Sequence, residues 1–220
     1  MCGRFTGVSF QEMLDIARDI EREAASRQVE LPFASDGVLC GVDAPAEEQS
    51  LFPELEPMRR DAFPGGIVPV VAATPQGLQV ANLIWGYQVP WQKGPVFNAR
   101  VETAMSPERN MWAESLRQRR CLIATHGFYE PSATETVTNP RTGRQVKRQY
   151  RFTLPGEGVF FLAGVYQGNR FSVMTCEPNR WVAPVHPRMP LALYPHEAPV
   201  WLSHQFPSLF DRSALQLEAQ

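Results

Sequence analysis

Lysine is almost absent from this chain of 220 residues, which has only Lys93 and Lys147 among its 21 basic residues. The other 21 − 2 = 19 are arginines, whose planar guanidinium forms forked bonds to phosphate and stacks on bases. A bias toward arginine codons would produce the same count. The formal net charge is -2, so no global positive field draws in nucleic acid. Composition alone therefore selects no partner.

The sequence also lacks paired cysteines. Cys2, Cys40, Cys121 and Cys176 are scattered and form no CxxC motif, which argues against a disulfide framework and gives no metal signature. Cys121 and Cys176 lie at the ends of apolar runs, where we expect small core residues. We expect no metal and no cofactor.

Long apolar runs are absent too. None approaches the ~20 residues that a membrane helix needs, and MCGRFTGVSF lacks the charged-then-apolar layout of a secretory signal. We expect a cytoplasmic monomer that does not interact with membranes.

What is present is a pattern of short strands separated by turns. The chain has 20 prolines, which favour many loops over a helical bundle. A capping box of Ser9 and Glu12 predicts a helix over residues 9–27, and a second helix is expected from Ser106 with Pro107 in its first turn. The strands are expected at IVPVVAA, LQVANLIWGY, CLIATHGFYE, QVKRQYRFTL, VFFLAGVYQ and RFSVMTCE, with a short last helix in HEAPVWLSH.

These elements predict one α+β domain over residues 1–220, with mostly strands and a few flanking helices. Residues 28–64 are acidic and proline-rich and lack periodicity, so we expect a surface loop or insertion there.

Cys2 carries the most distinctive chemistry. Removal of Met1 would leave an amine and a thiol two carbons apart, and an α-amine has a pKa of roughly 7.7–8.0, against about 10.4 for lysine. Such an amine can form a Schiff base with an aldehyde, and the thiol can then close a five-membered thiazolidine. A Met-Cys start also occurs by chance, so the assignment depends on its surroundings.

Several polar residues supply those surroundings. In VFNARVET, Asn98, Arg100 and Glu102 alternate along an expected extended segment and so share one side, although an exposed polar strand face has the same pattern. Glu130 ends an apolar strand, where a carboxyl can have a raised pKa and act as an acid or base, or can simply be solvated. His186, in VHPRMP, titrates near neutrality. The other three histidines are expected to be structural or solvated.

Taken together, these motifs resemble the SOS-response-associated peptidase (SRAP) family of abasic site processing proteins. The resemblance rests on MCGRF, WGYQVPW, FNARVET, GFYEP and VHPRMPLAL, in that order from residue 1 to about 205. It implies a twisted, barrel-like, mostly antiparallel β-sheet with a cleft for single-stranded DNA. It also implies a DNA-damage protein, lyase-like in its chemistry, that forms a covalent thiazolidine between Cys2 and the abasic-site aldehyde.

The resemblance also implies roles for individual residues. Asn98 would orient Cys2, Glu130 would assist ring opening and Schiff-base formation, and His186 would handle protons. The implied DNA-contacting residues are Arg4, Arg100, Arg188, Trp85 and Trp91. The peptidase label refers to removal of the residue ahead of the cysteine. The sequence departs from the family where RRDAFPGGIVP replaces a Tyr-Asn-x-x-Pro stretch and where Pro131 follows the glutamate.

Two other functions remain open at this point. Cys2, His186 and Glu130 are a thiol, an imidazole and a carboxylate, which are the parts of a cysteine peptidase. Alternatively, the chain could bind single-stranded DNA without any covalent chemistry.

Overall fold

The fold is organised around one long strand, β6 (Arg120–Thr138), which pairs antiparallel with four other strands. The computed structural model describes residues 2–31, 60–74, 76–108 and 110–220. The other principal strands are β1 (Phe5–Gly7), β2 (Arg60–Ala62), β3 (Ile67–Thr74), β4 (Gly77–Trp85), β5 (Asn98–Arg100), β7 (Gln145–Thr153), β8 (Phe160–Gln167) and β9 (Arg170–Cys176). Two-residue strands complete the sheet: β10 (Met189–Pro190), β11 (Ala192–Leu193) and β12 (Glu218–Ala219).

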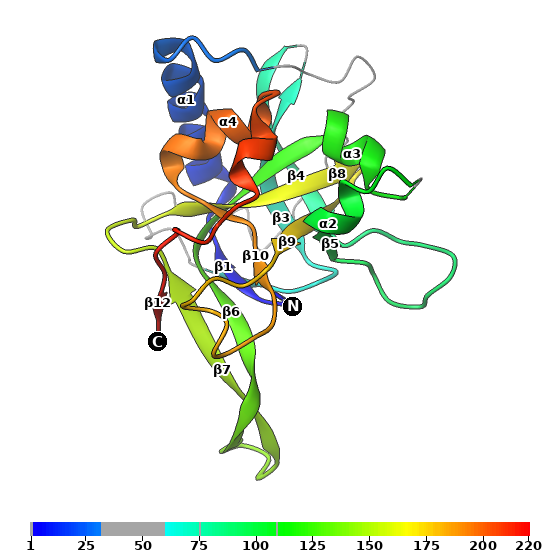
Figure 1. Ribbon diagram of the computed structural model, residues 1–220, viewed down its shortest axis with the longest axis vertical. Coiled ribbons are helices and arrows are strands. Elements are labelled where there is room, and N and C mark those ends of the chain that lie inside the picture. The colour runs from blue at the N-terminus through cyan, green and yellow to red at the C-terminus, as the bar shows by residue number, and fades with distance from the viewer. Residues whose placement is uncertain (1, 32–59, 75, 109) are drawn as a thin grey trace, which may run out of the picture.

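The sheet closes on itself. Neighbouring strands follow the order β8-β9-β4-β3-β6, and β6 pairs back onto β8, which completes a ring. Every pairing is antiparallel except those of β9 with β4 and with β5. The predicted barrel-like, mostly antiparallel α+β fold is therefore confirmed, and Figure 1 shows the curved sheet with its helices at the periphery.

The helices are short apart from α1 (Phe10–Ser26). The others are α2 (Val101–Ala104), α3 (Ala113–Gln118), α4 (Ala198–Leu202) and the 3-10 turns η2 (Pro195–Glu197) and η3 (Phe206–Leu209). Helix α1 starts as predicted, because the Ser9 hydroxyl accepts a hydrogen bond from the Glu12 amide at 3.2 Å. Its buried face, formed by Met13, Ala17, Ile20 and Ala24, packs near β3 and β4.

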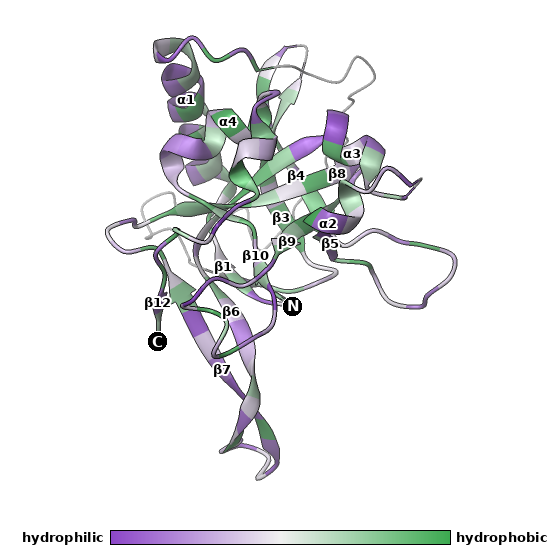
Figure 2. Cartoon of the chain, viewed as in Figure 1, coloured by the Kyte–Doolittle hydropathy of each residue, from purple (hydrophilic) through white to green (hydrophobic). Residues whose placement is uncertain are grey.

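The core fills the ring with the inward side chains of β3, β4, β6, β8 and β9, and includes the predicted Cys121 and Cys176. Hydrophobic residues accordingly gather in the central strands in Figure 2, whereas the outer face of α1 and much of the hairpin of β6 and β7 are hydrophilic. Among the described residues, no helix is both long and apolar enough to cross a membrane.

Two sequence-based boundaries are wrong. The expected loop over 28–64 includes β2, which pairs with β1 from Phe5↔Ala62 to Gly7↔Arg60, while residues 32–59 of it lie outside the described residues. The helix expected from Ser106 does not form: the chain turns there, and α2 and α3 lie on either side. Ser106 instead accepts a hydrogen bond from the Glu108 amide, two residues ahead, which closes a turn.

Candidate active site

Cys2 is fully buried and lies three residues before Phe5, the first residue of β1. The Tyr129 amide donates to the Arg4 carbonyl at 2.9 Å, and Phe5 pairs with Phe128 on β6. This pairing brings the start of the chain alongside the segment of β6 that carries Glu130. Burial, together with the negative charge of Glu130, raises the pKa of the Cys2 thiol. The thiol is therefore neutral at physiological pH.

Asn98 anchors the main chain of Cys2. It begins β5, whose register against β9 is set by Asn98↔Val173. Its side-chain Nδ2 donates to the Cys2 carbonyl at 3.0 Å, across 96 positions of sequence. Its Oδ1 is buried without a hydrogen-bond partner among the described residues, so the amide retains an acceptor beside Cys2.

Glu130 lies on β6 opposite Tyr150 and is completely buried. Burial raises the pKa of its carboxyl group to about 7, because the charged form loses its hydration. At neutral pH a large fraction of Glu130 is therefore protonated and able to donate a proton.

His186 faces Glu130, with its Nδ1 3.5 Å from Glu130 Oε2. The same Nδ1 lies 2.8 Å from the Arg188 carbonyl and 3.2 Å from the Arg188 amide nitrogen. The contact with the carbonyl requires a proton on Nδ1, whereas the contact with the amide requires a lone pair there, so the two contacts correspond to opposite tautomers of the ring. Partial burial lowers the pKa of the imidazole, which favours its neutral form.

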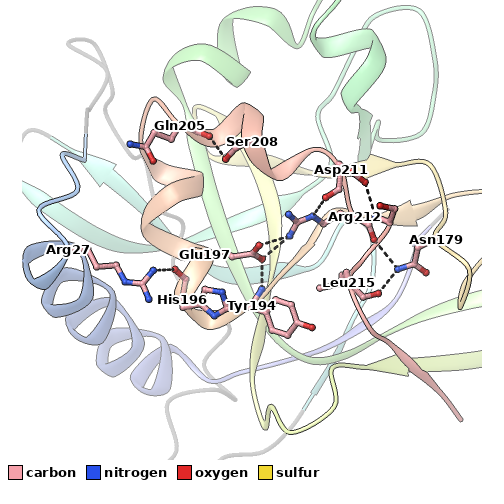
Figure 3. A network of polar contacts seen from close by, with 11 residues as sticks. Arg27, Asn179, Tyr194, His196, Glu197, Gln205, Ser208, Asp211, Arg212 and Leu215 are labelled. Carbon is pink, nitrogen blue, oxygen red and sulfur yellow. Dashed lines mark hydrogen bonds and ion pairs between the residues drawn. The ribbon is translucent and has the colours of Figure 1, made fainter.

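A set of hydrogen bonds fixes the turn that leads to His186. Asn179 Oδ1 accepts from the Val182 amide, and the Val182 carbonyl accepts from the His186 amide at 2.9 Å. The Asn179 Nδ2 donates to the carbonyls of Arg212 and Leu215, which ties this turn to the C-terminal segment (Figure 3). The position of His186 thus depends on residues more than 25 positions away.

The site therefore combines a neutral thiol, an acid that titrates near neutrality and a neutral imidazole within one buried corner. Such a group can move protons onto and off a carbonyl compound. Among the described residues, no set of three histidine, cysteine or acidic side chains is arranged to hold a metal ion.

A cavity of about 350 Å³ is lined by the sequence neighbours of Cys2 and Glu130, and by none of Cys2, Asn98, Glu130 and His186 themselves. Arg4 borders it and forms an ion pair with Asp61, and its guanidinium lies 4.0 Å from the centre of the Tyr129 ring. Phe63 is 54% exposed on the same cavity. The complete lining is Gly3, Arg4, Phe63, Tyr129, Pro131 and Gln149.

Sequence reasoning missed Asp61, Phe63 and Tyr129. Asp61 binds both Arg4 and, through its Oδ1, the hydroxyl of Thr6 at 2.9 Å. The pairing of β2 with β1 places Asp61 and the neighbouring Phe63 there, and the pairing of β6 with β1 places Tyr129 there. The sequence signal that could have pointed to this cavity was a hydrophobic residue, Phe63, next to a proline, but the surrounding residues have the pattern of a loop.

Two of the other residues predicted to contact DNA are exposed. Arg100 is exposed at the end of β5, and Trp91 is 67% exposed. The alternation predicted for Asn98, Arg100 and Glu102 ends at Arg100, because Glu102 already belongs to α2.

The remaining two, Trp85 and Arg188, are enclosed by other residues of the protein. Trp85 is fully buried, packs on Phe5 with ring centres 4.8 Å apart and donates from Nε1 to a main-chain carbonyl, so we correct its assignment to the core. An indole ring that is buried in this way has no exposed face on which a base could stack. The Arg188 guanidinium is bound by Glu102 through two 2.9 Å hydrogen bonds and by Glu177 at 2.7 Å. In this arrangement its charge is already neutralised.

Comparison with known proteins places these residues in context. A family model described as SOS response associated peptidase (SRAP) matches residues 1–217. The abasic site processing protein YoaM of Bacillus subtilis (strain 168) is 29% identical over 139 residues, which is 57% of this chain and 57% of that protein. The chain thus matches little more than half the length of that relative. The abasic site processing protein YedK of Escherichia coli (strain K12) is 24% identical over 216 residues, 93% of this chain and 81% of that protein.

Solved structures share the fold. A phage-related protein of Bordetella bronchiseptica superposes with a TM-score of 0.59 at 20% identity, covering 100% of this chain and 94% of its own. A protein of Bacteroides thetaiotaomicron gives a TM-score of 0.59 at 18% identity, covering 99% of this chain and 90% of its own. At these identities the likeness concerns the fold alone.

Proposed function

We propose that this chain, which belongs to the SOS response associated peptidase (SRAP) family, binds single-stranded DNA and forms a thiazolidine crosslink between Cys2 and the aldehyde of an abasic site. The observation that carries the proposal is the burial of Cys2 next to Glu130, with His186 Nδ1 3.5 Å from that carboxylate. The relatives are named abasic site processing proteins, which supports the choice of substrate.

The covalent step begins with an unblocked α-amine, so it requires that Met1 be removed. The amine of Cys2 adds to the aldehyde carbon to give a carbinolamine. A proton from Glu130 allows the hydroxyl to leave as water, and a carbon–nitrogen double bond forms. Because the pKa of Glu130 is about 7, the carboxyl can both donate this proton and accept one afterwards.

The thiol then completes the ring. Its sulfur bonds to the carbon of the protonated imine, and its proton passes to the Glu130 carboxylate left by the previous step. The electron pair of the carbon–nitrogen double bond returns to the nitrogen, which keeps its own hydrogen. One water is released overall and no electrons are exchanged. Asn98 holds the Cys2 main chain through its 3.0 Å hydrogen bond, which limits the motion of amine and thiol during closure.

His186 has a separate task. Its neutral imidazole has one nitrogen without a proton, which can take a proton from the sugar hydroxyl while Glu130 protonates the ring oxygen. Opening of the sugar ring in this way would produce the reactive aldehyde.

A direct test uses an oligonucleotide in which uracil glycosylase has created one abasic site. Met1-processed wild-type protein, verified by intact mass spectrometry, should form a heat-stable complex with the DNA. Cys2→Ala should form none, while Cys121→Ala, which removes another buried thiol, should behave as wild type. Crosslinking by Cys2→Ala at the wild-type rate would remove Cys2 from the mechanism.

The cysteine peptidase alternative receives less support. Acyl transfer by cysteine uses a thiolate, and burial together with the charge of Glu130 raises the pKa of the Cys2 thiol. Peptide cleavage that requires Cys2 and proceeds at the same rate with and without DNA would support this alternative. Binding of DNA without a crosslink, after verified removal of Met1, would favour a non-covalent module.

A further inference from the structure

The longest hairpin of the molecule leaves the sheet next to the candidate active site. Strands β6 and β7 continue past Glu130 into an arm, residues 132–150, which projects away from the body in Figure 1. The Ala133 amide donates to the Val185 carbonyl at 2.8 Å, so the root of the arm is attached to the segment that carries His186.

The arm has the opposite charge from the rest of the chain. It contains Arg141, Arg144, Lys147 and Arg148 against Glu135 alone, so its formal charge is 4 − 1 = +3. The whole chain has a charge of -2, which leaves -2 − 3 = -5 for all other residues. A local positive field of this kind attracts a polyanion even when the whole molecule does not.

Three of these cations are available to a ligand. Arg141, Arg144 and Lys147 are exposed, and within the described part of the chain no ion pair involves them. Arg148 differs, because it lies 3.1 Å from Glu135 and stacks over the Tyr150 ring.

The arm continues the surface of the cavity that Gly3 and Arg4 border. Gln149 lines that cavity, and Lys147 shares its face of β7 because alternate residues of a strand point to the same side. The two lie about 7 Å apart along the strand, and the tip at Arg144 is about 17 Å from Gln149, at ~3.4 Å per residue. Positive charge therefore extends outward from this cavity along one element.

We infer that the arm is a binding site for the phosphate backbone of the DNA that flanks the lesion, with Lys147 next to the site and Arg144 and Arg141 further out. The inference rests on the proposed function, since it concerns the same DNA. The pairs Val137↔Val146 and Thr136↔Lys147 hold the two strands in register and present the cations on a defined scaffold.

The test measures reversible binding to DNA that contains a tetrahydrofuran abasic analogue, which has no aldehyde and cannot crosslink. One oligonucleotide carries ten nucleotides on each side of the analogue and another carries two. Wild type and Arg141→Gln/Arg144→Gln are titrated by fluorescence anisotropy over a series of salt concentrations.

Each phosphate contact contributes ~0.7 to the slope of log affinity against log salt. On the long DNA the double variant should therefore have a slope smaller by about 1.4, which corresponds to an affinity about 25-fold lower at 0.1 M salt. On the short DNA it should match wild type. Lys147→Gln should lose about 0.7 from the slope on the long DNA. Arg141→Lys/Arg144→Lys keeps both charges and should retain the slope.

The matched control is Arg18→Gln/Arg22→Gln, which removes two exposed cations from α1 and should leave the slope unchanged. An arm variant with the wild-type slope on long DNA, in a protein that still binds and crosslinks, would overturn the arm site alone. Failure of wild type to bind the analogue or to crosslink would instead overturn the proposed function. Equal losses on short and long DNA would also reject the arm as a flank-binding site.

Discussion

Replacing Glu130 with glutamine should change the pH dependence of stability in a way that reports its burial. The folded protein raises the pKa of Glu130 from its ordinary 4.5 to about 7. A raised acid pKa means that the folded state holds a proton that the unfolded state has already released. Its contribution to stability is therefore fully present below about pH 4.5 and is lost as the pH rises through about 7.

The size of the effect follows from the shift. Between 4.5 and about 7, at about 1.4 kcal/mol per pH unit, wild type should lose about 3 kcal/mol of unfolding free energy because of Glu130. Glu130→Gln has no such proton to lose. The variant should therefore gain about 3 kcal/mol relative to wild type between about pH 4.5 and about pH 8.5, whatever its stability at the acid end.

Urea unfolding of both proteins at intervals across this range measures that difference, because contributions from all other titrating groups cancel between them. Glu218→Gln removes an exposed carboxylate and should give a curve parallel to wild type. A constant difference between Glu130→Gln and wild type across the range would refute the reasoning, since Glu130 would then titrate alike in the folded and unfolded chains.

Two further predictions concern arginines. Arg100→Ala should reduce the salt slope of single-stranded DNA binding by about 0.7, because it removes one phosphate contact; an unchanged slope in anisotropy titrations would exclude that contact. Arg120→Met should cost at least about 3 kcal/mol in urea unfolding, because the buried guanidinium donates to five carbonyls at the ends of α3 and α4 that would be left unsatisfied. A cost below about 1 kcal/mol would show that water replaces the guanidinium as the hydrogen-bond donor to these carbonyls.

Local patterns in the sequence were sufficient for the elements with strong periodicity or turn chemistry. The capping box of Ser9 and Glu12 predicted helix α1, and the short apolar runs between turns predicted the longer strands. These predictions held because both signals act between residues only a few positions apart.

Elements whose stability comes from distant partners were predicted poorly. Arg60–Ala62 became a strand because it adds to β1, and Ser106 became a turn although its sequence resembles a helix start. Trp85 was assigned to the surface from its motif, yet the closed ring of strands leaves it inside the core. Nothing within a few residues of these positions records the neighbour that decides the outcome.

The sequence by itself determined which chemical groups this protein has: a cysteine that follows the initiator methionine, an amide, a carboxylate and an imidazole, each in a recognisable motif. Only the tertiary structure decided where they meet and how they ionise. Residues 2, 98, 130 and 186 come together because β6 pairs with β1 and closes onto β8, and β5 lies beside β9. Burial in that corner then raises the pKa of Glu130 and of the Cys2 thiol, since the desolvation of a charge depends on everything packed around it.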